Sequence, residues 1–226
     1  MGLKLEVLPD GDAASKRGAE LIAAAGKEAV GERGEFALGL SGGKTPWRMI
    51  ALLGDDPRMP WEQTQIFQVD ERVAPPGSED RNLTHLIGML SISHQPAVKP
   101  MPVTSRDLEA AAREYEEQLP ERLDFVHLGI GPDGHTASLV PGDPVLDVTD
   151  RRVAMTGGEY QSHRRMTLTY PELSRARQIL WLAIGEKARD PLGRLLDGDR
   201  SIPAGRVEND AMVAVVDEAA AGDRRS

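Results

Sequence analysis

Short apolar runs alternate with amphipathic or alanine-rich stretches along almost the whole chain. Short continuous apolar runs are typical of buried strands, and the longer stretches between them have the composition of helices. We therefore predict strands at 3–8, 36–40, 65–69, 125–130, 152–156, 165–170, 179–184 and 212–216. Helices are predicted at 12–30, 46–53, 82–90, 108–119 and 186–196, with a short one after Pro171.

This alternation predicts an α/β fold. Apolar strands separated by helices are typical of a mostly parallel, doubly wound, Rossmann-like sheet with helices on both faces. A proline-rich connector with Pro96, Pro100 and Pro102 follows the helix predicted at 82–90. Because no repeat or linker divides the chain, we expect a single domain over 1–220 and a frayed C-terminal tail over 221–226.

The composition narrows the classes of partner. The chain has 226 residues and a formal net charge of −9, which argues against nucleic acid or an anionic membrane surface as a partner. An anionic ligand would have to meet a local cluster of basic residues. The absence of cysteine excludes thiol nucleophiles, disulfides and cysteine-ligated metals. Since there is neither a signal-peptide pattern nor an apolar run of ~18 residues, we expect a cytoplasmic protein with no membrane partner.

Residues 39–46 read GLSGGKTP and fit three motifs to different degrees. A nucleotide-binding P-loop requires a glycine at position 38, which is occupied by Leu38, so that motif is excluded. The serine-hydrolase elbow G-x-S-x-G fits residues 39–43 with Ser41 as the nucleophile, but only one predicted strand precedes the strand that leads to it. That interpretation stays open as an alternative, as does a plain strand-to-helix turn that needs its glycines.

The same residues also suit a phosphate-binding loop at a helix N-terminus. Gly42 and Gly43 let the backbone turn sharply and bring its amides close to a bound anion. Thr45 is a good N-cap and Pro46 a good first helical residue, so the predicted helix points its positive end at the loop. Lys44 adds a positive charge.

A second glycine loop, GIGPDG at 129–134, satisfies the dinucleotide fingerprint G-x-G-x-x-G. The fingerprint requires a full helix after its third glycine, and the prolines and glycine at 141, 142 and 144 interrupt any such helix. What remains is an apolar strand with Asp133 and His135 directly after it, at the sheet edge where open α/β sheets bind ligands. An imidazole there can accept a proton from water at neutral pH. The other histidines are expected to be surface or packing residues: His85, His94, His127 and His163.

A third polar triplet, Asp70-Glu71-Arg72, follows the strand predicted at 65–69. Taken alone, it is a common surface charge cluster. Its position after an apolar strand places it with the two glycine loops, so three strand ends supply a phosphate loop, an acidic and basic cluster, and a histidine.

Together these segments resemble the 6-phosphogluconolactonase family. The resemblance rests on SGGKTP (41–46), VDERVAPP (69–76), GIGPDGHTASLVP (129–141), RMTLT (165–169), LAIGEKA (182–188) and DEAA (217–220). These motifs span nearly the whole chain, and they imply the fold shared with the glucosamine-6-phosphate deaminases. Val140 departs from the phenylalanine that the lactonases often have, and Arg81 departs from a frequent serine.

The resemblance implies hydrolysis of 6-phospho-D-glucono-1,5-lactone, the second step of the oxidative pentose phosphate pathway, with no metal ion, nucleotide or other cofactor. We expect His135 to take a proton from water while Asp133 orients its imidazole or only forms the turn. Arg72 is expected to hold the lactone oxygens or the developing oxyanion, and Asp70 to position Arg72 or bind a sugar hydroxyl. The phosphate- or substrate-binding residues are expected to be Ser41, Gly42, Gly43, Lys44, Thr45, Asn82, Arg165 and Lys187.

Two further functions stay open at this point. An amino-sugar phosphate deaminase or isomerase is disfavoured because Arg72 stands where the resemblance places its tyrosine and Val140 where it places a carboxylate. A non-catalytic sugar-phosphate-binding module is disfavoured because we find no helix-turn-helix segment of a regulator. We expect a monomer or a weak homodimer.

Overall fold

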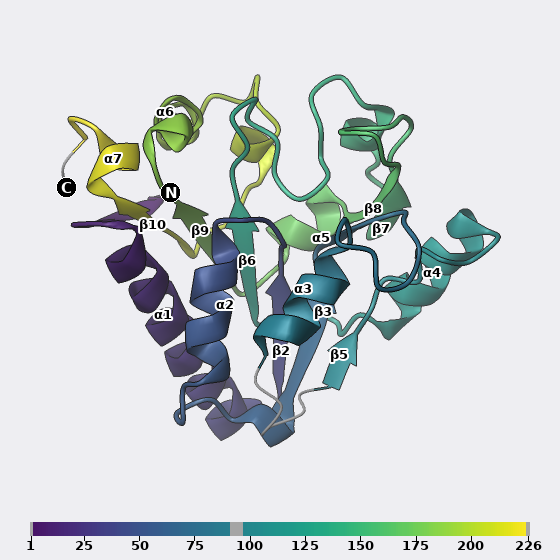
Figure 1. Ribbon diagram of the computed structural model, residues 1–226, viewed down its shortest axis with the longest axis horizontal. Coiled ribbons are helices and arrows are strands. Elements are labelled where there is room, and N and C mark those ends of the chain that lie inside the picture. Colours follow the sequence, from purple (N-terminus) through teal and green to yellow (C-terminus); the bar gives the residue numbers. More distant parts are fainter. Residues whose placement is uncertain (1, 91–96, 225–226) are drawn as a thin grey trace.

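The computed structural model describes residues 2–90 and 97–224, and its centre is a seven-stranded sheet (Figure 1). Every pair of neighbouring strands in this sheet is parallel. In spatial order the strands are β1 (Lys4–Leu8), β10 (Met212–Asp217), β9 (Gln178–Ala183), β6 (Phe125–Gly129), β2 (Phe36–Leu40), β3 (Thr64–Gln68) and β5 (Ala97–Lys99). The prediction of a mostly parallel sheet is confirmed.

Helices cover both faces of the sheet, as predicted. One hydrophobic cluster joins the sheet to α1 (Gly11–Arg33), α2 (Pro46–Gly54) and α3 (Asn82–Met89). A second cluster on the other face includes residues of α4 (Leu108–Gln118), α5 (Tyr170–Ser174), α6 (Arg189–Leu196) and α7 (Glu218–Ala221). Four 3₁₀ helices complete the described helices: η1 (Trp61–Gln63), η2 (Pro144–Asp147), η3 (Glu186–Ala188) and η4 (Ala204–Arg206).

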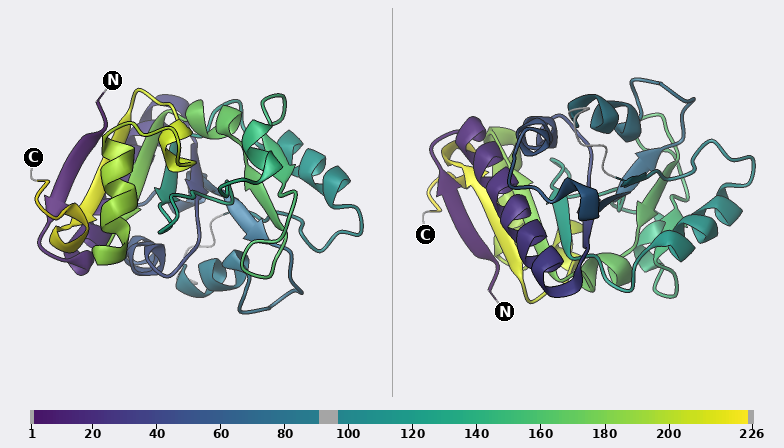
Figure 2. Two further views of the ribbon diagram at one scale, coloured as in Figure 1. Left: turned by 90° about the horizontal axis from the view of Figure 1, so that it is seen from above. Right: turned by 90° about the horizontal axis from the view of Figure 1, so that it is seen from below.

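The central strand β2 shows why these residues form a buried sheet. All five of its residues are buried, and consecutive side chains enter opposite clusters, Ala37 on one face and Leu38 on the other. A strand buried on both faces reads as a continuous apolar run rather than an alternating one. Both chain ends lie at the β1–β10 edge, at the opposite end of the molecule from α4 (Figures 1 and 2).

A small antiparallel sheet, which the sequence analysis did not predict, lies beside the main one. It contains β4 (Asp70–Arg72), β8 (Arg165–Leu168) and β7 (Val153–Met155), in that order. The triplet at 70–72 is therefore a strand and not a loop. Val69 connects the two sheets, because its N–H donates to the carbonyl of Leu40 in the main sheet (3.0 Å) and its carbonyl accepts from Leu168 N–H in the small one (2.8 Å).

Three segments differ from the expected boundaries. The proline-rich connector contains β5 at the sheet edge, and Pro96 falls outside the described residues, as does His94. The helix expected at 186–196 is divided into η3 and α6. The tail expected from 221 does not begin there: Ala221 ends α7 and is buried, and residues 225 and 226 lie outside the described part.

The strand order reverses between β2 and β6, and this position determines where a ligand can bind. From β2 the chain proceeds outward through β3 to β5, whereas β6 lies on the other side of β2 and leads to β9 and β10. Diverging loops at such a point leave a crevice at the carboxyl ends of the strands. None of the helices in residues 2–90 and 97–224 is long and apolar enough to cross a membrane.

Candidate active site

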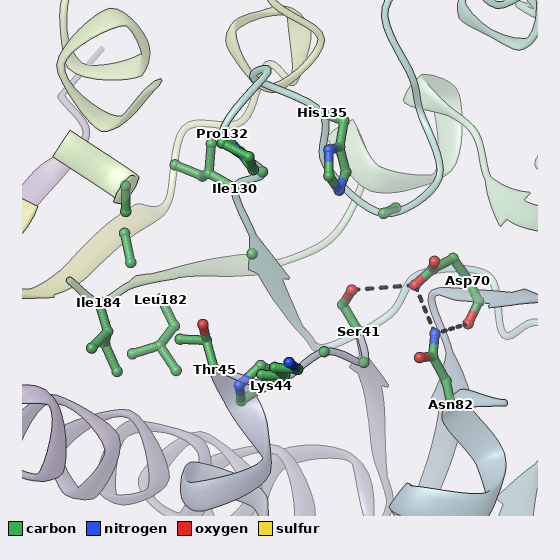
Figure 3. A pocket seen from close by; sticks show the side chains of 18 of the residues that line it. Ser41, Lys44, Thr45, Asp70, Asn82, Ile130, Pro132, His135, Leu182 and Ile184 are labelled. Atoms are coloured by element: carbon green, nitrogen blue, oxygen red, sulfur yellow. Dashed lines mark hydrogen bonds between the residues drawn. The ribbon is translucent and has the colours of Figure 1, made fainter. Parts of the chain in front are cut away.

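A cavity of ≈ 320 Å³ lies at the carboxyl ends of β2, β3, β6 and β9. This volume is at the lower end of the range for small-molecule sites. The sequence analysis singled out many of its lining residues: Ser41, Gly42, Gly43, Lys44, Thr45, Asp70, Arg72, Asn82, His135, Arg165 and Lys187. Figure 3 shows His135 on one side of this cavity, and Ser41, Lys44 and Thr45 on the opposite side.

The loop at 41–45 connects the buried strand β2 to α2. Gly43 has a φ of 127°, a conformation that only glycine adopts without strain. At position 42 an added Cβ would lie 2.1 Å from Oδ1 of Asn82, so only glycine fits there. These two glycines therefore have steric reasons to be present at the cavity wall.

Thr45 is the N-cap residue of α2 and Pro46 begins the helix, as predicted, but the Thr45 hydroxyl does not cap it. Thr45 occupies the N-cap position with φ −65° and ψ −50°, and its side chain makes no capping hydrogen bond. This helical backbone geometry differs from the extended one in which an N-cap hydroxyl reaches the following amides. Because the Thr45 side chain does not cap the helix, the first amides of α2 remain as donors toward the loop.

Asp70 joins three segments of the cavity wall. Its side chain is almost fully buried (4 % exposed), and it accepts hydrogen bonds from Ser41 Oγ (3.2 Å) and Ser138 Oγ (2.7 Å). Asn82 Nδ2 donates to the backbone carbonyl of Asp70 (3.0 Å) and lies 3.4 Å from its carboxylate (Figure 3). We expected Asp70 to position Arg72 or bind a hydroxyl. Among the described residues no hydrogen bond joins the Asp70 carboxylate to Arg72, whose guanidinium donates to the carbonyl of Asp80 (2.9 Å). The role in binding a sugar hydroxyl stays a prediction.

Glu71, to which the sequence analysis gave no role, connects strand β4 to the start of α3. Its carboxylate is fully buried and accepts from the backbone N–H groups of Arg72 (2.8 Å), Asn82 (2.8 Å) and Leu83 (2.9 Å). It also pairs with Arg81, whose Nε is 3.4 Å away. Glu71 therefore satisfies the first amides of α3 and fixes both strand β4 and Asn82. The only sign of this role in the sequence was the position of Glu71 between Asp70 and Arg72.

His135 is held by a carboxylate and by close packing against a glycine. Its Nδ1 lies 2.5 Å from Oδ1 of Asp133, and an added Cβ at Gly131 would lie 2.0 Å from two atoms of the ring. The second glycine of the G-x-G-x-x-G pattern thus leaves room for an imidazole. Burial raises the pKa of Asp133, but the hydrogen bond and charge of His135 outweigh it, so the pKa lies below its ordinary value. With Nδ1 held by Asp133, Nε2 is the ring nitrogen available to a ligand.

Four cationic side chains line the cavity: Lys44, Arg72, Arg165 and Lys187. Arg165 is 3 % exposed, and burial lowers its pKa while the charge of Asp70 raises it. In the described part of the chain no carboxylate lies within 4.0 Å of the Arg165 guanidinium. A buried cation without a carboxylate partner is stabilised by an anionic ligand. The local basic cluster that an acidic chain would need for an anion is therefore present.

His127 is a packing residue, as expected. It lies on β6 opposite Leu40, is fully buried, and neither ring nitrogen has a hydrogen-bond partner among the described residues. Burial lowers the pKa of His127 to about 3. It is neutral at physiological pH and supports the strand that leads to the loop at 41–45.

Tyr160 lies beside the site and is another residue that sequence reasoning missed. Its hydroxyl donates to Oδ2 of Asp133 (3.0 Å), and its carbonyl accepts from Arg165. It stands in an irregular segment with no apolar periodicity, so no signal in the sequence marked it. Within residues 2–90 and 97–224 no group of three or more histidine, aspartate or glutamate side chains could hold a metal ion.

Comparisons with known proteins give a consistent family description. The family model described as "Glucosamine-6-phosphate isomerases/6-phosphogluconolactonase" matches residues 9–216. Curated relatives named 6-phosphogluconolactonase include one from Synechocystis sp., 34% identical over 74% of each chain, and one from Mycobacterium tuberculosis, 32% identical over 90% of this chain and 91% of that one.

Solved structures give the same family name. The 6-phosphogluconolactonase from Thermotoga maritima has a TM-score of 0.85 and 26% identity, over 95% of this chain and 99% of that one. That from Shewanella baltica has a TM-score of 0.86 and 25% identity, over 95% and 97%. A monomeric glucosamine-6-phosphate deaminase shares the fold, with a TM-score of 0.82 at 20% identity over 98% of this chain and 100% of that one.

Proposed function

This chain belongs to the glucosamine-6-phosphate isomerase/6-phosphogluconolactonase family, and from that premise we propose that it hydrolyses 6-phospho-D-glucono-1,5-lactone to 6-phospho-D-gluconate. The observation that carries the proposal is that one cavity has the carboxylate-bound imidazole of His135 on one side and a glycine loop with a lysine on the other. A phosphate ester and a cyclic ester at opposite ends of one sugar fit these two sides.

The phosphate binds at residues 41–45 in this proposal. The amides of Gly42 and Gly43 and the N-terminus of α2 donate to its oxygens, and Lys44 supplies a positive charge. Lys187, which enters from η3 after β9, lines the same cavity and closes over the phosphate. Ser41 contributes a hydroxyl that Asp70 holds, and no covalent bond to it forms.

The ester is cleaved by water that His135 activates. Nε2 takes a proton from the water as its oxygen bonds to C1 of the lactone, and the carbonyl oxygen becomes an oxyanion. The guanidiniums of Arg72 and Arg165 stabilise that charge. When the bond from C1 to the ring oxygen breaks, the proton on Nε2 passes to the ring oxygen, which becomes the hydroxyl of the product. Asp133 holds Nδ1–H and stabilises the imidazolium that forms between these steps.

Val140 supports hydrolysis over amino-sugar deamination. The resemblance places a carboxylate of the deaminases at this position, and Val140 is apolar and buried (8 % exposed). An apolar side chain cannot move a proton during ring opening. Arg72 likewise stands where the resemblance places their tyrosine.

A coupled assay with freshly generated 6-phosphogluconolactone, corrected for spontaneous hydrolysis, tests the proposal. We expect clear acceleration by the wild type, a loss of about 10²–10⁴-fold in kcat for His135→Asn because general-base help is worth that much, and unchanged kinetics for the control His85→Asn. Absence of acceleration would refute the lactonase proposal, and sustained ammonia release from glucosamine 6-phosphate would identify a deaminase. Full activity of His135→Asn would refute the assigned base alone.

A further inference from the structure

Tyr160 lies in a tight hairpin between β7 and β8 that borders the cavity. Its N–H donates to the carbonyl of His163 (2.9 Å), and His163 N–H donates back (3.3 Å). The two central residues have positive φ angles, 51° for Gln161 and 67° for Ser162. Such turns favour asparagine and glycine, and other residues persist there only where the surrounding structure holds them. The hairpin is therefore held in a conformation that its own sequence does not favour.

The Tyr160 side chain completes the contacts of the carboxylate that holds the imidazole. Its hydroxyl donates to Oδ2 of Asp133 (3.0 Å), while Oδ1 of the same carboxylate is 2.5 Å from His135 Nδ1. The tyrosine ring packs edge-on against the imidazole, with centroids 5.2 Å apart and planes at 64°. Each oxygen of Asp133 thus has its own donor, so the carboxylate cannot rotate away from His135 without losing one. Burial, followed by the hydrogen bond to Asp133 and then by the charge of that carboxylate, raises the pKa of Tyr160, which keeps the hydroxyl protonated as a donor.

The same residue also holds the buried cation of the site. The Tyr160 carbonyl accepts from Nε and Nη2 of Arg165 (3.2 and 3.1 Å), and the guanidinium lies 5.1 Å from the centre of the tyrosine ring. Gln161 Oε1 accepts from Arg165 as well (3.2 Å), and Gln161 lines the cavity. One short hairpin therefore fixes a catalytic imidazole through its hydroxyl and a ligand-binding guanidinium through its backbone and ring.

We propose that Tyr160 is a positioning residue for lactone hydrolysis, acting on His135 through Asp133 and separately on Arg165. The inference rests on the proposed function, because it concerns the same imidazole. Tyr160 is not among the residues that line the cavity, so it acts through its two neighbours and not by touching the substrate.

Two variants separate the contribution of the Tyr160 hydroxyl from that of its ring. Tyr160→Phe removes only the hydroxyl, so we expect kcat to fall by about 3- to 10-fold, the loss expected for one hydrogen bond to a charged group that is partly exposed. KM should stay within about twofold, since the ring and carbonyl still hold Arg165. Tyr160→Leu should show the same loss in kcat and also raise KM. The matched control is Tyr170→Phe, which removes a hydroxyl bonded to the Pro203 carbonyl (3.0 Å) and should change neither parameter.

A double-mutant cycle with Asp133→Ala tests the path of the effect. If the hydroxyl acts through Asp133, adding Tyr160→Phe to Asp133→Ala should cause no further loss in kcat. Wild-type kinetics for Tyr160→Phe, or an equal loss in both backgrounds, would overturn the inference. Full activity of His135→Asn would instead refute the assigned base, whatever the tyrosine variants show.

Discussion

Gly131→Ala tests whether the chemistry depends on the exact place of the imidazole. The added methyl carbon would lie 2.0 Å from Cε1 and Nδ1 of His135. Non-bonded carbon atoms approach to about 3.5–4.0 Å, so the ring has to withdraw by about 1.5 Å. The 2.5 Å contact with Asp133 then exceeds hydrogen-bond length, which ends at about 3.2 Å.

This displacement gives the expected size of the effect. A misplacement of 1 Å can cost about 10²-fold in rate, and general-base help as a whole is worth about 10²–10⁴-fold. We therefore expect kcat to fall by about 10²-fold. KM should change little, because the proposed phosphate-binding loop at 41–45 lies on the other side of the cavity. The fold should persist, since the ring is partly exposed (20 %) and can turn toward solvent.

The coupled lactone assay measures this loss, with thermal unfolding as a check on folding. Gly31→Ala on α1 is the control, because nothing lies within 4 Å of the added methyl group and the helix is only favoured by the change. Its kcat and KM should equal those of the wild type. A kcat for Gly131→Ala within about threefold of the wild type would refute the assignment of His135 as a base that works from this position.

Three further outcomes are expected. Ser41→Ala should raise KM by about 3- to 10-fold and keep kcat within about threefold, because the backbone amides remain; abolished turnover would restore the serine-nucleophile alternative. Glu71→Gln should lower the free energy of unfolding by about 2–4 kcal/mol, since one of its buried acceptor oxygens becomes a donor facing donors; an unchanged urea midpoint would contradict this. His127 has a folded pKa of about 3, below the ordinary value of about 6.5, so the unfolded chain binds the proton first and stability falls as pH drops below 6.5. Between pH 6.5 and 5 the free energy of unfolding of the wild type should therefore fall by about 1.7 kcal/mol more than that of His127→Leu. An equal change in the two proteins would exclude this linkage.

The sequence predicted the elements whose stability comes from continuous burial. Strands such as β2 and β6 are apolar at nearly every position, because helices cover both faces of the parallel sheet. It also predicted which loops line the cavity, since glycine-rich turns at strand ends coincide with the crevice of an open α/β sheet.

The sequence did not predict features that depend on contacts between distant segments. Strand β4 consists of Asp70, Glu71 and Arg72, and hydropathy assigns such a triplet to the surface. The two carboxylates are nevertheless buried, because Ser41, residues of α3 and Ser138 supply their hydrogen bonds. These donors come from up to 68 positions away in the chain, and no local pattern encodes such pairings.

The shared residue Val69 has a consequence for how a ligand enters. Its N–H bonds to one sheet and its carbonyl to the other, so the two walls of the cavity cannot swing apart as separate bodies without breaking one of these hydrogen bonds. Opening of the cavity by a hinge motion of the two sheets is therefore costly. We expect substrate and product to enter and leave through movements of side chains and turns at the rim of the cavity. The residues that the two sheets carry into the cavity then keep their positions whether or not a ligand is bound.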